Sequence, residues 1–139
     1  MGRILSIDYG LKRVGLAVTD PLKMIASPLE TIESNTAPSY IKTYCQKEEV
    51  ERIIIGMPKD LQNKDTHSTE AVRKFIITLK KELTDMPITE VDERFTSKMA
   101  FQSMIDGGLK KKDRKNKGTI DKLSATIILQ SYLDANPTI

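Results

Sequence analysis

The sequence predicts an α/β fold built on one five-stranded mixed sheet that is flanked by helices. Three observations lead to this prediction: the first forty residues lack helical periodicity, a continuous apolar run follows at residues 51–56, and helical patterns surround that run. Three antiparallel strands followed by alternating helices and strands imply a single sheet with helices on its faces. We expect one domain that spans residues 1–139.

The expected elements follow one another through short connections. They are strands at residues 3–9, 14–19 and 24–33, a helix at 39–49, a strand at 51–56, a helix that includes residues 72–83, a strand at 87–92, and helices at 96–105 and 119–133. Gly10 to Arg13 is short enough to join the first two strands as a hairpin, and Pro21 fixes φ in the turn after the second. Pro28 favours an edge position or a bulge for the third strand.

Periodicity and capping residues define the later elements. The run at 51–56 is typical of a strand that is buried on both faces, and residues 72–83 carry apolar side chains at helical spacing. Thr96 can cap the following helix, which Gly107 and Gly108 end. The sequence therefore predicts that helices and strands alternate after the third strand.

Composition excludes several classes of protein. The chain is 39% hydrophobic, which is too apolar for disorder throughout, and it has no run of about 18 apolar residues that could span a membrane. Asp8 interrupts the apolar centre that a signal peptide needs. The single cysteine, Cys45, cannot form an internal disulfide, and no Cys/His cluster could hold zinc. We therefore expect a cytoplasmic protein that does not associate with membranes.

Acidic residues stand at the ends of three elements that are expected to be buried. Asp8 ends the first strand, on the face that Ile4 and Ser6 share, and Asp121 begins the last helix in line with an apolar stripe. Asp92 and Glu93 end the last strand and point to opposite faces, so only one of them can share the side of Asp8.

Each of these acids also has a local explanation. Asp8 can start a turn with Gly10, Arg94 can pair with an acid at the strand end, and Asp121 complements the positive end of a helix. Taken together they favour a site, because ligands of open α/β sheets bind at the carboxyl ends of the parallel strands.

Three carboxylates at one edge predict a divalent metal site. They repel each other and raise each other's pKa unless a cation neutralises them, and hard oxygen ligands suit Mg²⁺ or Mn²⁺. Two such ions can activate water and stabilise the leaving oxygen of a phosphodiester. His67 is the only histidine and is expected at the surface, which favours metal-activated water. Residues 10–15 have Walker-like spacing, but Leu16-Ala17 follows where Lys-Ser/Thr is required.

A flexible basic loop is expected at residues 107–118. Residues 110–117 alone carry +5, against +3 for the whole chain, so the rest of the chain is slightly negative. Its cations are Lys110, Lys111, Lys112, Arg114, Lys115 and Lys117. The loop is either a solvated surface segment or, because it leads directly into Asp121, a grip for phosphates that weakens steeply with salt.

Four segments in a fixed order resemble the YqgF (RuvX) family over nearly the whole chain. They are Ile7-Asp8-Tyr9-Gly10 with residues 13–17, Gly56-Met57-Pro58, residues 91–97, and Ile120-Asp121 with residues 128–133. The resemblance implies an RNase H-like fold, a relation to the RuvC Holliday junction resolvases, and a bacterial cytoplasmic nuclease that processes the 5′ end of precursor 16S rRNA. It also implies that Asp8, Glu93 and Asp121 are the catalytic, metal-binding acids, which selects Glu93 over Asp92.

Two segments depart from the family pattern. After Gly56-Met57-Pro58 the family usually has a short stretch that ends in Asp-Gly, but residues 59–64 of this chain contain no Gly. Ser124 occupies a position where resolvases that resemble RuvC carry a further Asp. The second departure implies weaker binding of a second ion and bears on resolvase activity.

The sequence therefore predicts a two-metal-ion endonuclease, with Arg94 and the basic loop positioning the phosphates of a structured nucleic acid. The expected partner is precursor rRNA, with a ribosomal precursor particle as its setting. One alternative is a resolvase of four-way DNA junctions, which needs two symmetrical sites. Another is a non-catalytic RNA-binding factor for ribosome assembly. An actin-like or sugar-kinase-like ATPase would need a second domain. The oligomeric state, monomer or weak dimer, stays open.

Overall fold

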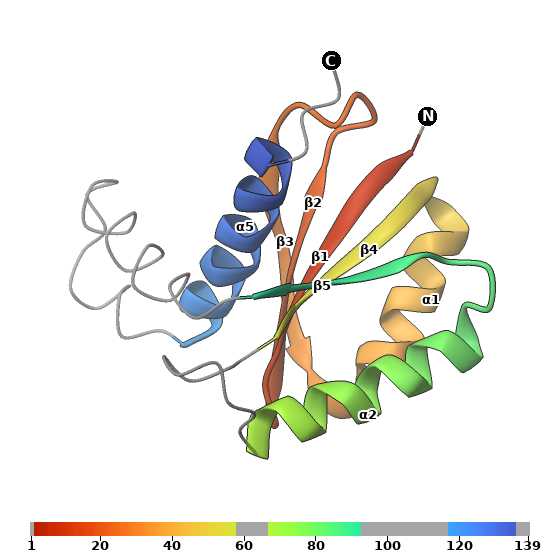
Figure 1. The fold of residues 1–139 in the computed structure, drawn as a ribbon, viewed down its shortest axis with the longest axis vertical. Coiled ribbons are helices and arrows are strands. Elements are labelled where there is room, and N and C mark those ends of the chain that lie inside the picture. Colours follow the sequence, from red (N-terminus) through yellow and green to blue (C-terminus); the bar gives the residue numbers. More distant parts are fainter. Residues whose placement is uncertain (1, 58–66, 93–116, 136–139) are drawn as a thin grey trace.

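The computed structural model describes residues 2–57, 67–92 and 117–135, in which five strands form a sheet between helices (Figure 1). The elements are β1 (Arg3–Tyr9), β2 (Arg13–Thr19), β3 (Ala26–Glu33), the 3-10 helix η1 (Ser34–Thr36), α1 (Ala37–Lys47), β4 (Val50–Met57), α2 (His67–Glu82), β5 (Ile88–Asp92) and α5 (Lys117–Ala135). The predicted order is confirmed for these elements. The helix expected at 96–105 and the segment 59–64 lie outside the described residues.

The sheet has the strand order β3-β2-β1-β4-β5. β1 pairs antiparallel with β2, and β2 with β3, whereas β1 pairs parallel with β4, and β4 with β5. The predicted mixed sheet is therefore confirmed. Because β1, β4 and β5 are parallel, all three end at one edge of the sheet, at Tyr9, Met57 and Asp92. We call this edge the carboxyl edge.

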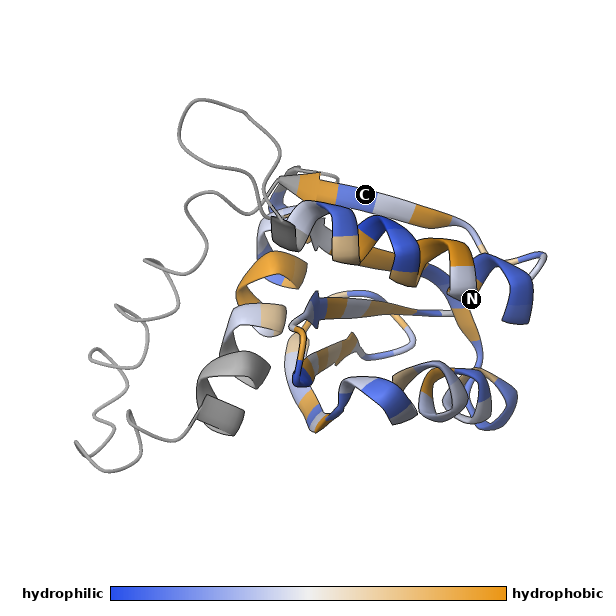
Figure 2. Cartoon of the chain, turned by 90° about the horizontal axis from the view of Figure 1, so that it is seen from below, coloured by the Kyte–Doolittle hydropathy of each residue, from blue (hydrophilic) through white to orange (hydrophobic). Residues whose placement is uncertain are grey.

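Helices cover both faces of the sheet. α5 lies on one side of the strands and α1 with α2 on the other, as the two perpendicular views show (Figures 1 and 2). β4 accordingly sends Ile53 and Ile55 into the core beneath α1 and α2, and Ile54 into the core beneath α5. All three side chains are completely buried, which confirms that this apolar run is a strand buried on both faces.

β3 lies at an edge of the sheet and contains a bulge, as Pro28 predicts. Leu16 pairs with Glu30 while the next residue, Ala17, pairs with Pro28, so the edge strand carries one extra residue at this point. A proline has no N–H to donate to a sheet ladder, and both an edge and a bulge remove the need for one.

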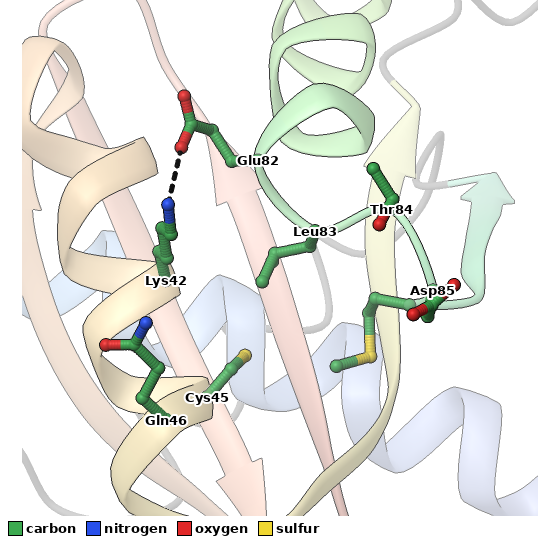
Figure 3. Close-up of a pocket in the computed structure, with 8 residues that line it drawn as sticks. Lys42, Cys45, Gln46, Glu82, Leu83, Thr84 and Asp85 are labelled. Carbon is green, nitrogen blue, oxygen red and sulfur yellow. Dashed lines mark hydrogen bonds and ion pairs between the residues drawn. The ribbon is translucent and has the colours of Figure 1, made fainter.

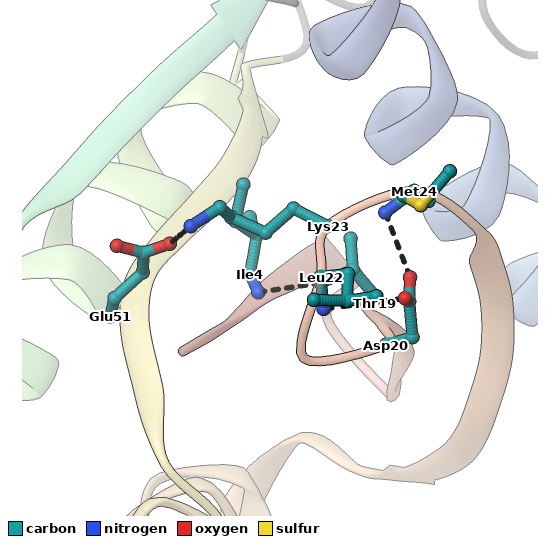
Figure 4. Close-up of polar contacts among 7 residues, drawn as sticks. All are labelled: Ile4, Thr19, Asp20, Leu22, Lys23, Met24 and Glu51. Atoms are coloured by element: carbon teal, nitrogen blue, oxygen red, sulfur yellow. Dashed lines mark hydrogen bonds and ion pairs between the residues drawn. The ribbon is translucent and has the colours of Figure 1, made fainter. Parts of the chain in front are cut away.

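The turn between β2 and β3 is held by the side chain of Asp20 (Figure 4). The Lys23 N–H donates to the Asp20 carbonyl at 2.9 Å, which closes the predicted turn. The carboxylate of Asp20 accepts hydrogen bonds from the N–H groups of Leu22 (3.3 Å), Met24 (2.8 Å) and Ile25 (2.8 Å). These bonds stabilise the charged form and hold the pKa of Asp20 below its usual value.

Several predicted boundaries differ from the observed ones. β3 begins at Ala26 instead of residue 24, because the N–H groups of the two preceding residues are bonded to Asp20. α1 begins at Ala37, two residues early, since Pro38 suits the first turn of a helix. The basic loop expected at 107–118 overlaps α5 by two residues, because α5 begins at Lys117. Within the described ranges, no helix has both the length and the apolar character to cross a bilayer.

Candidate active site

Asp8 lies near the end of β1, the central strand of the sheet, and is half-buried. The even-numbered residues of β1 face α5: Ile4 belongs to the core beneath that helix, and Ser6 is hydrogen-bonded to it. Alternation along the strand places Asp8 on the same face. The prediction that these three residues share one face is therefore consistent with the contacts of the strand.

A buried hydrogen bond fixes the position of α5 along the direction of β1. The Oγ of Ser6 donates to the carbonyl of Ala125 at 2.8 Å, and α5 begins near the edge at which β1 ends (Figure 1). Going back from Ala125 to Asp121 covers four helical residues, or about 6 Å. Going forward from Ser6 to Asp8 covers two strand residues, or about 6.6 Å. The backbones of Asp8 and Asp121 therefore lie at about the same level.

The predicted apolar stripe of α5 is confirmed by its packing. Ala125 and Ile128 are completely buried against the sheet, and Ser124 is 6% exposed. Asp121 continues this stripe one turn earlier, within α5, but its side chain lies outside what the structure describes. The helix that carries this acid is thus fixed to the face of β1 that Asp8 occupies.

β5 reaches the carboxyl edge two strands away from β1. Ile7 pairs with Ile55, and Gly56 pairs with Val91, so Asp8 is level with Val91 across β4. Two strand spacings separate these backbones by about 10 Å. Val91 packs against the core beneath α5. Glu93 comes two residues later in the chain and lies outside the described residues.

The predicted phosphate-binding residues are not described either. Outside the described part of the chain lie Arg94, Lys110, Lys111, Lys112, Arg114 and Lys115, and the same holds for the side chains of Lys117 and His67. Among described residues, no three of His, Cys, Asp and Glu are grouped so that they could hold a metal ion. Of the three expected ligands, only Asp8 has a described side chain. Its carboxylate oxygens are the kind of ligand that hard divalent ions prefer.

The hairpin after Asp8 is closed by its own backbone. The N–H of Gly10 donates to the carbonyl of Arg13 at 2.9 Å. A Cβ at position 10 would lie 2.6 Å from that same carbonyl oxygen, so only glycine fits there. The hairpin therefore explains why position 10 is a glycine. A role of Asp8 in starting the turn is not needed to explain the glycine.

Sequence reasoning missed two surface hollows at the carboxyl edge. One is lined by the β1–β2 hairpin, Glu33 and η1, and the other by Tyr9, η1, Pro38 of α1 and the middle of α2. Both include Ser34 and Asn35, which the sequence analysis did not single out. The available signal was a polar run, Ser34-Asn35-Thr36, between an edge strand and a helix that has Pro38 in its first turn.

A third hollow lies far from these, between the C-terminal parts of α1 and α2 (Figure 3). Lys42 and Glu82 form an ion pair at 3.2 Å at its rim, and Cys45 lines it. Burial raises the pKa of the Cys45 thiol to about 11, which keeps it protonated and a poor nucleophile at neutral pH. This hollow therefore lacks an activated nucleophile.

The fold matches solved structures of RuvC. The chain superposes on Thermus thermophilus RuvC in complex with a Holliday junction substrate with a TM-score of 0.62 and 15% identity, covering 98% of this chain and 97% of that one. A second Thermus thermophilus RuvC structure gives a TM-score of 0.55 and 13% identity, covering 95% and 96% of the two chains. The fold class is therefore the RNase H-like fold of RuvC, as predicted.

Comparison of the sequence with known protein families and relatives shows the family to which the chain belongs. The family model described as "RuvX: Holliday junction resolvase" matches residues 2–135. A protein of Amoebophilus asiaticus is 53% identical, covering 97% of this chain and 96% of its own length. One of Flavobacterium psychrophilum is 53% identical, covering 96% and 97%. Both carry the name "Putative pre-16S rRNA nuclease". The chain belongs to the RuvX family, also called YqgF, which confirms the resemblance and agrees with the predicted nuclease class.

Proposed function

We propose that this chain is an endonuclease that hydrolyses phosphodiester bonds in precursor 16S rRNA, with Mg²⁺ or Mn²⁺ as its ion. The name of its relatives supports the substrate. The observation that carries the proposal is the Ser6–Ala125 hydrogen bond, which brings the first turn of α5 level with Asp8 at the carboxyl edge. A site at this edge agrees with the general place of ligands in open α/β sheets.

Asp8, Glu93 and Asp121 are the proposed ligands of the ion. A divalent ion bound there supplies charge stabilisation for the phosphate and lowers the pKa of a coordinated water. Asp8 stands on a fixed backbone, because β1 is paired on both sides within the sheet. Arg94 and the cations of residues 110–117 are proposed to hold the neighbouring phosphates, which makes binding depend on salt.

The test is cleavage of precursor 16S rRNA by the purified chain, with and without Mg²⁺ or Mn²⁺. Asp8→Asn and Asp121→Asn are expected to lower the rate by a hundredfold or more, since each removes a charged ligand of the ion. Asp20→Asn is the matched control: it neutralises an aspartate of the turn between β2 and β3 whose carboxylate is bonded within that turn. Cleavage by Asp8→Asn at the wild-type rate would contradict the proposal.

A second candidate is a resolvase of four-way DNA junctions. The description of the matching family model favours it. Resolution of a junction needs two symmetrically placed sites, so this candidate predicts a dimer on the substrate and cleavage of a synthetic four-way junction in preference to precursor rRNA. A third outcome, RNA binding that survives neutralisation of all three acids and ignores the metal, would instead identify a non-catalytic assembly factor.

A further inference from the structure

Two hollows at the carboxyl edge share lining residues, and the second of them reaches α1 and α2, which cover one side of the sheet. The first, of about 560 Å³, is lined by Leu11, Lys12, Arg13 and Glu33 together with Ser34 and Asn35. The second, of about 290 Å³, continues from Ser34 and Asn35 to Tyr9, Lys74, Phe75 and Thr78. Because both hollows share two lining residues, we treat them as one feature and call it the edge groove.

Hydrogen bonds fix the shape of the first half of the edge groove. The N–H of Ser34 donates to the carbonyl of Lys12 at 3.0 Å, and the Oγ of Ser34 donates to the carbonyl of Leu11 at 2.6 Å. The hairpin itself is closed by the bond between Gly10 and Arg13. The hairpin and η1 are therefore tied together, so this half of the groove is formed before any ligand arrives.

The second half is anchored to the residue that follows Asp8. The ring of Tyr9 packs on the ring of Phe75 from α2, with centroids 4.6 Å apart and planes tilted by 34°. Asp8 faces α5, whereas Tyr9 packs into the core on the other side of the sheet. The edge groove thus begins one residue away from the proposed ion site, around the end of β1.

The charges of the edge groove suit an extended anion. Lys12 and Arg13 lie at one end and Lys74 at the other, and Glu33 is the acid among its lining residues. The side chains of Lys12 and Lys74 are exposed. Cations at the two ends of a groove match successive phosphates along a strand better than one isolated phosphate, around which they would converge.

We propose that the edge groove holds the phosphate backbone of the RNA strand whose cleaved bond lies beside Asp8. This inference rests on the proposed function and adds a described binding surface to it. Lys12 and Lys74 contact phosphates, while Ser34, Asn35 and Thr78 offer polar contacts between them. The groove positions the strand and takes no part in bond cleavage.

The test compares two double variants of the full chain. Lys12→Gln with Lys74→Gln removes two cations from the edge groove. Lys47→Gln with Lys81→Gln is the matched control, since it removes two exposed lysines that do not line the edge groove, from the last turns of α1 and α2. Binding of a fluorescent precursor 16S rRNA fragment is measured by anisotropy over a salt series, with Ca²⁺ in place of Mg²⁺ to limit cleavage. Thermal melts verify that all variants fold.

The groove variant is expected to bind about 25-fold more weakly at 0.1 M salt, and its salt slope is expected to fall by about 1.4, because each contact to a single strand contributes about 0.7. In cleavage assays its KM rises while kcat stays near the wild-type value. The control stays within about twofold of wild type.

Three outcomes overturn the inference. Equal losses in the two variants would show a general charge effect, and unchanged binding by the groove variant would exclude the groove while leaving the proposed function intact. An affinity that is the same for a mononucleotide and a long fragment would identify a small-ligand site instead. If the wild-type chain neither binds nor cleaves the RNA, the proposed function itself fails.

Discussion

The two edges of the sheet use the same residue type in different ways. At the turn between β2 and β3, the carboxylate of Asp20 accepts three N–H groups of its own turn, and its role is local. At the carboxyl edge, Asp8 lies one residue before the end of the central strand, beside a helix that a buried hydrogen bond fixes in place. The position of an aspartate in the fold, rather than its residue type, therefore distinguishes one that stabilises a turn from one that suits a metal-binding active site.

The largest expected effect comes from a comparison of two neighbouring acids, Asp92, the last residue of β5, and Glu93, the next residue in the chain. Alternation along a strand predicts that Asp92 and Glu93 point to opposite faces. Glu93→Gln is expected to lower cleavage of precursor 16S rRNA by a hundredfold or more, since it removes a ligand of the ion, and Asp92→Asn by less than about threefold. Initial rates under saturating Mg²⁺ measure both. The reverse order would reassign the ligand to Asp92.

A prediction of intermediate size compares the loss of two buried hydroxyl groups, those of Ser6 and Thr19. Ser6 donates to the Ala125 carbonyl of α5, and Thr19 accepts from the Ile4 N–H at 2.9 Å near the other edge. Ser6→Ala is expected to cost about 1 kcal/mol of stability, and Thr19→Val about 1–3 kcal/mol because it leaves a buried N–H without its acceptor.

Only Ser6→Ala should affect catalysis, by roughly tenfold, because it loosens the helix that carries Asp121. Urea unfolding and cleavage rates on the same preparations check this pair. If Thr19→Val lowered the rate as much as Ser6→Ala, the loss would follow stability instead of the position of α5.

A smaller effect concerns pH and the turn at Asp20. The folded-state pKa of this carboxyl is lowered by bonds from Ile25 and Met24, so its contribution to stability is present above the unfolded pKa and is lost as pH falls through the folded one. Asp20→Asn should therefore lower Tm at pH 7, and the gap to wild type should close below about pH 4. Circular dichroism melts over a pH series measure the gap, and a constant gap would contradict the bonding described.

The smallest effect is expected at Cys45, at the edge opposite the proposed site. With its pKa raised to about 11, the thiol should react with iodoacetamide at pH 8 on the order of a hundredfold more slowly than an ordinary cysteine. Cys45→Ser should leave cleavage unchanged. Mass spectrometry follows the alkylation, and rapid labelling of the folded chain would show that the thiol is not held protonated.

Much of the fold could be predicted from local patterns. The apolar run of β4 indicated burial on both faces, and Pro28 indicated an edge or a bulge; the structure has both features at β3. Boundaries were less predictable, because they depend on specific bonds. The start of β3, for example, depends on which N–H groups the Asp20 side chain accepts.

The candidate site was predictable only in its parts. The residues indicated that Asp8 and Asp121 end buried elements, and the family resemblance selected Glu93. The edge groove was not foreseen, since Lys12, Ser34 and Lys74 come from a hairpin, a 3-10 helix and α2, and no spacing in the sequence links them. The single-domain span of residues 1–139 and the cytoplasmic location stay predictions.

The sequence by itself determined which segments become strands and helices and which face of each is apolar, because those properties depend on neighbours a few residues away. Only the tertiary structure decided that β4 lies between β1 and β5 and that α5 is fixed level with the end of β1. These arrangements depend on contacts between residues far apart in the sequence: 48 positions from Ile7 to Ile55 and 119 from Ser6 to Ala125. No local pattern can specify contacts over that separation.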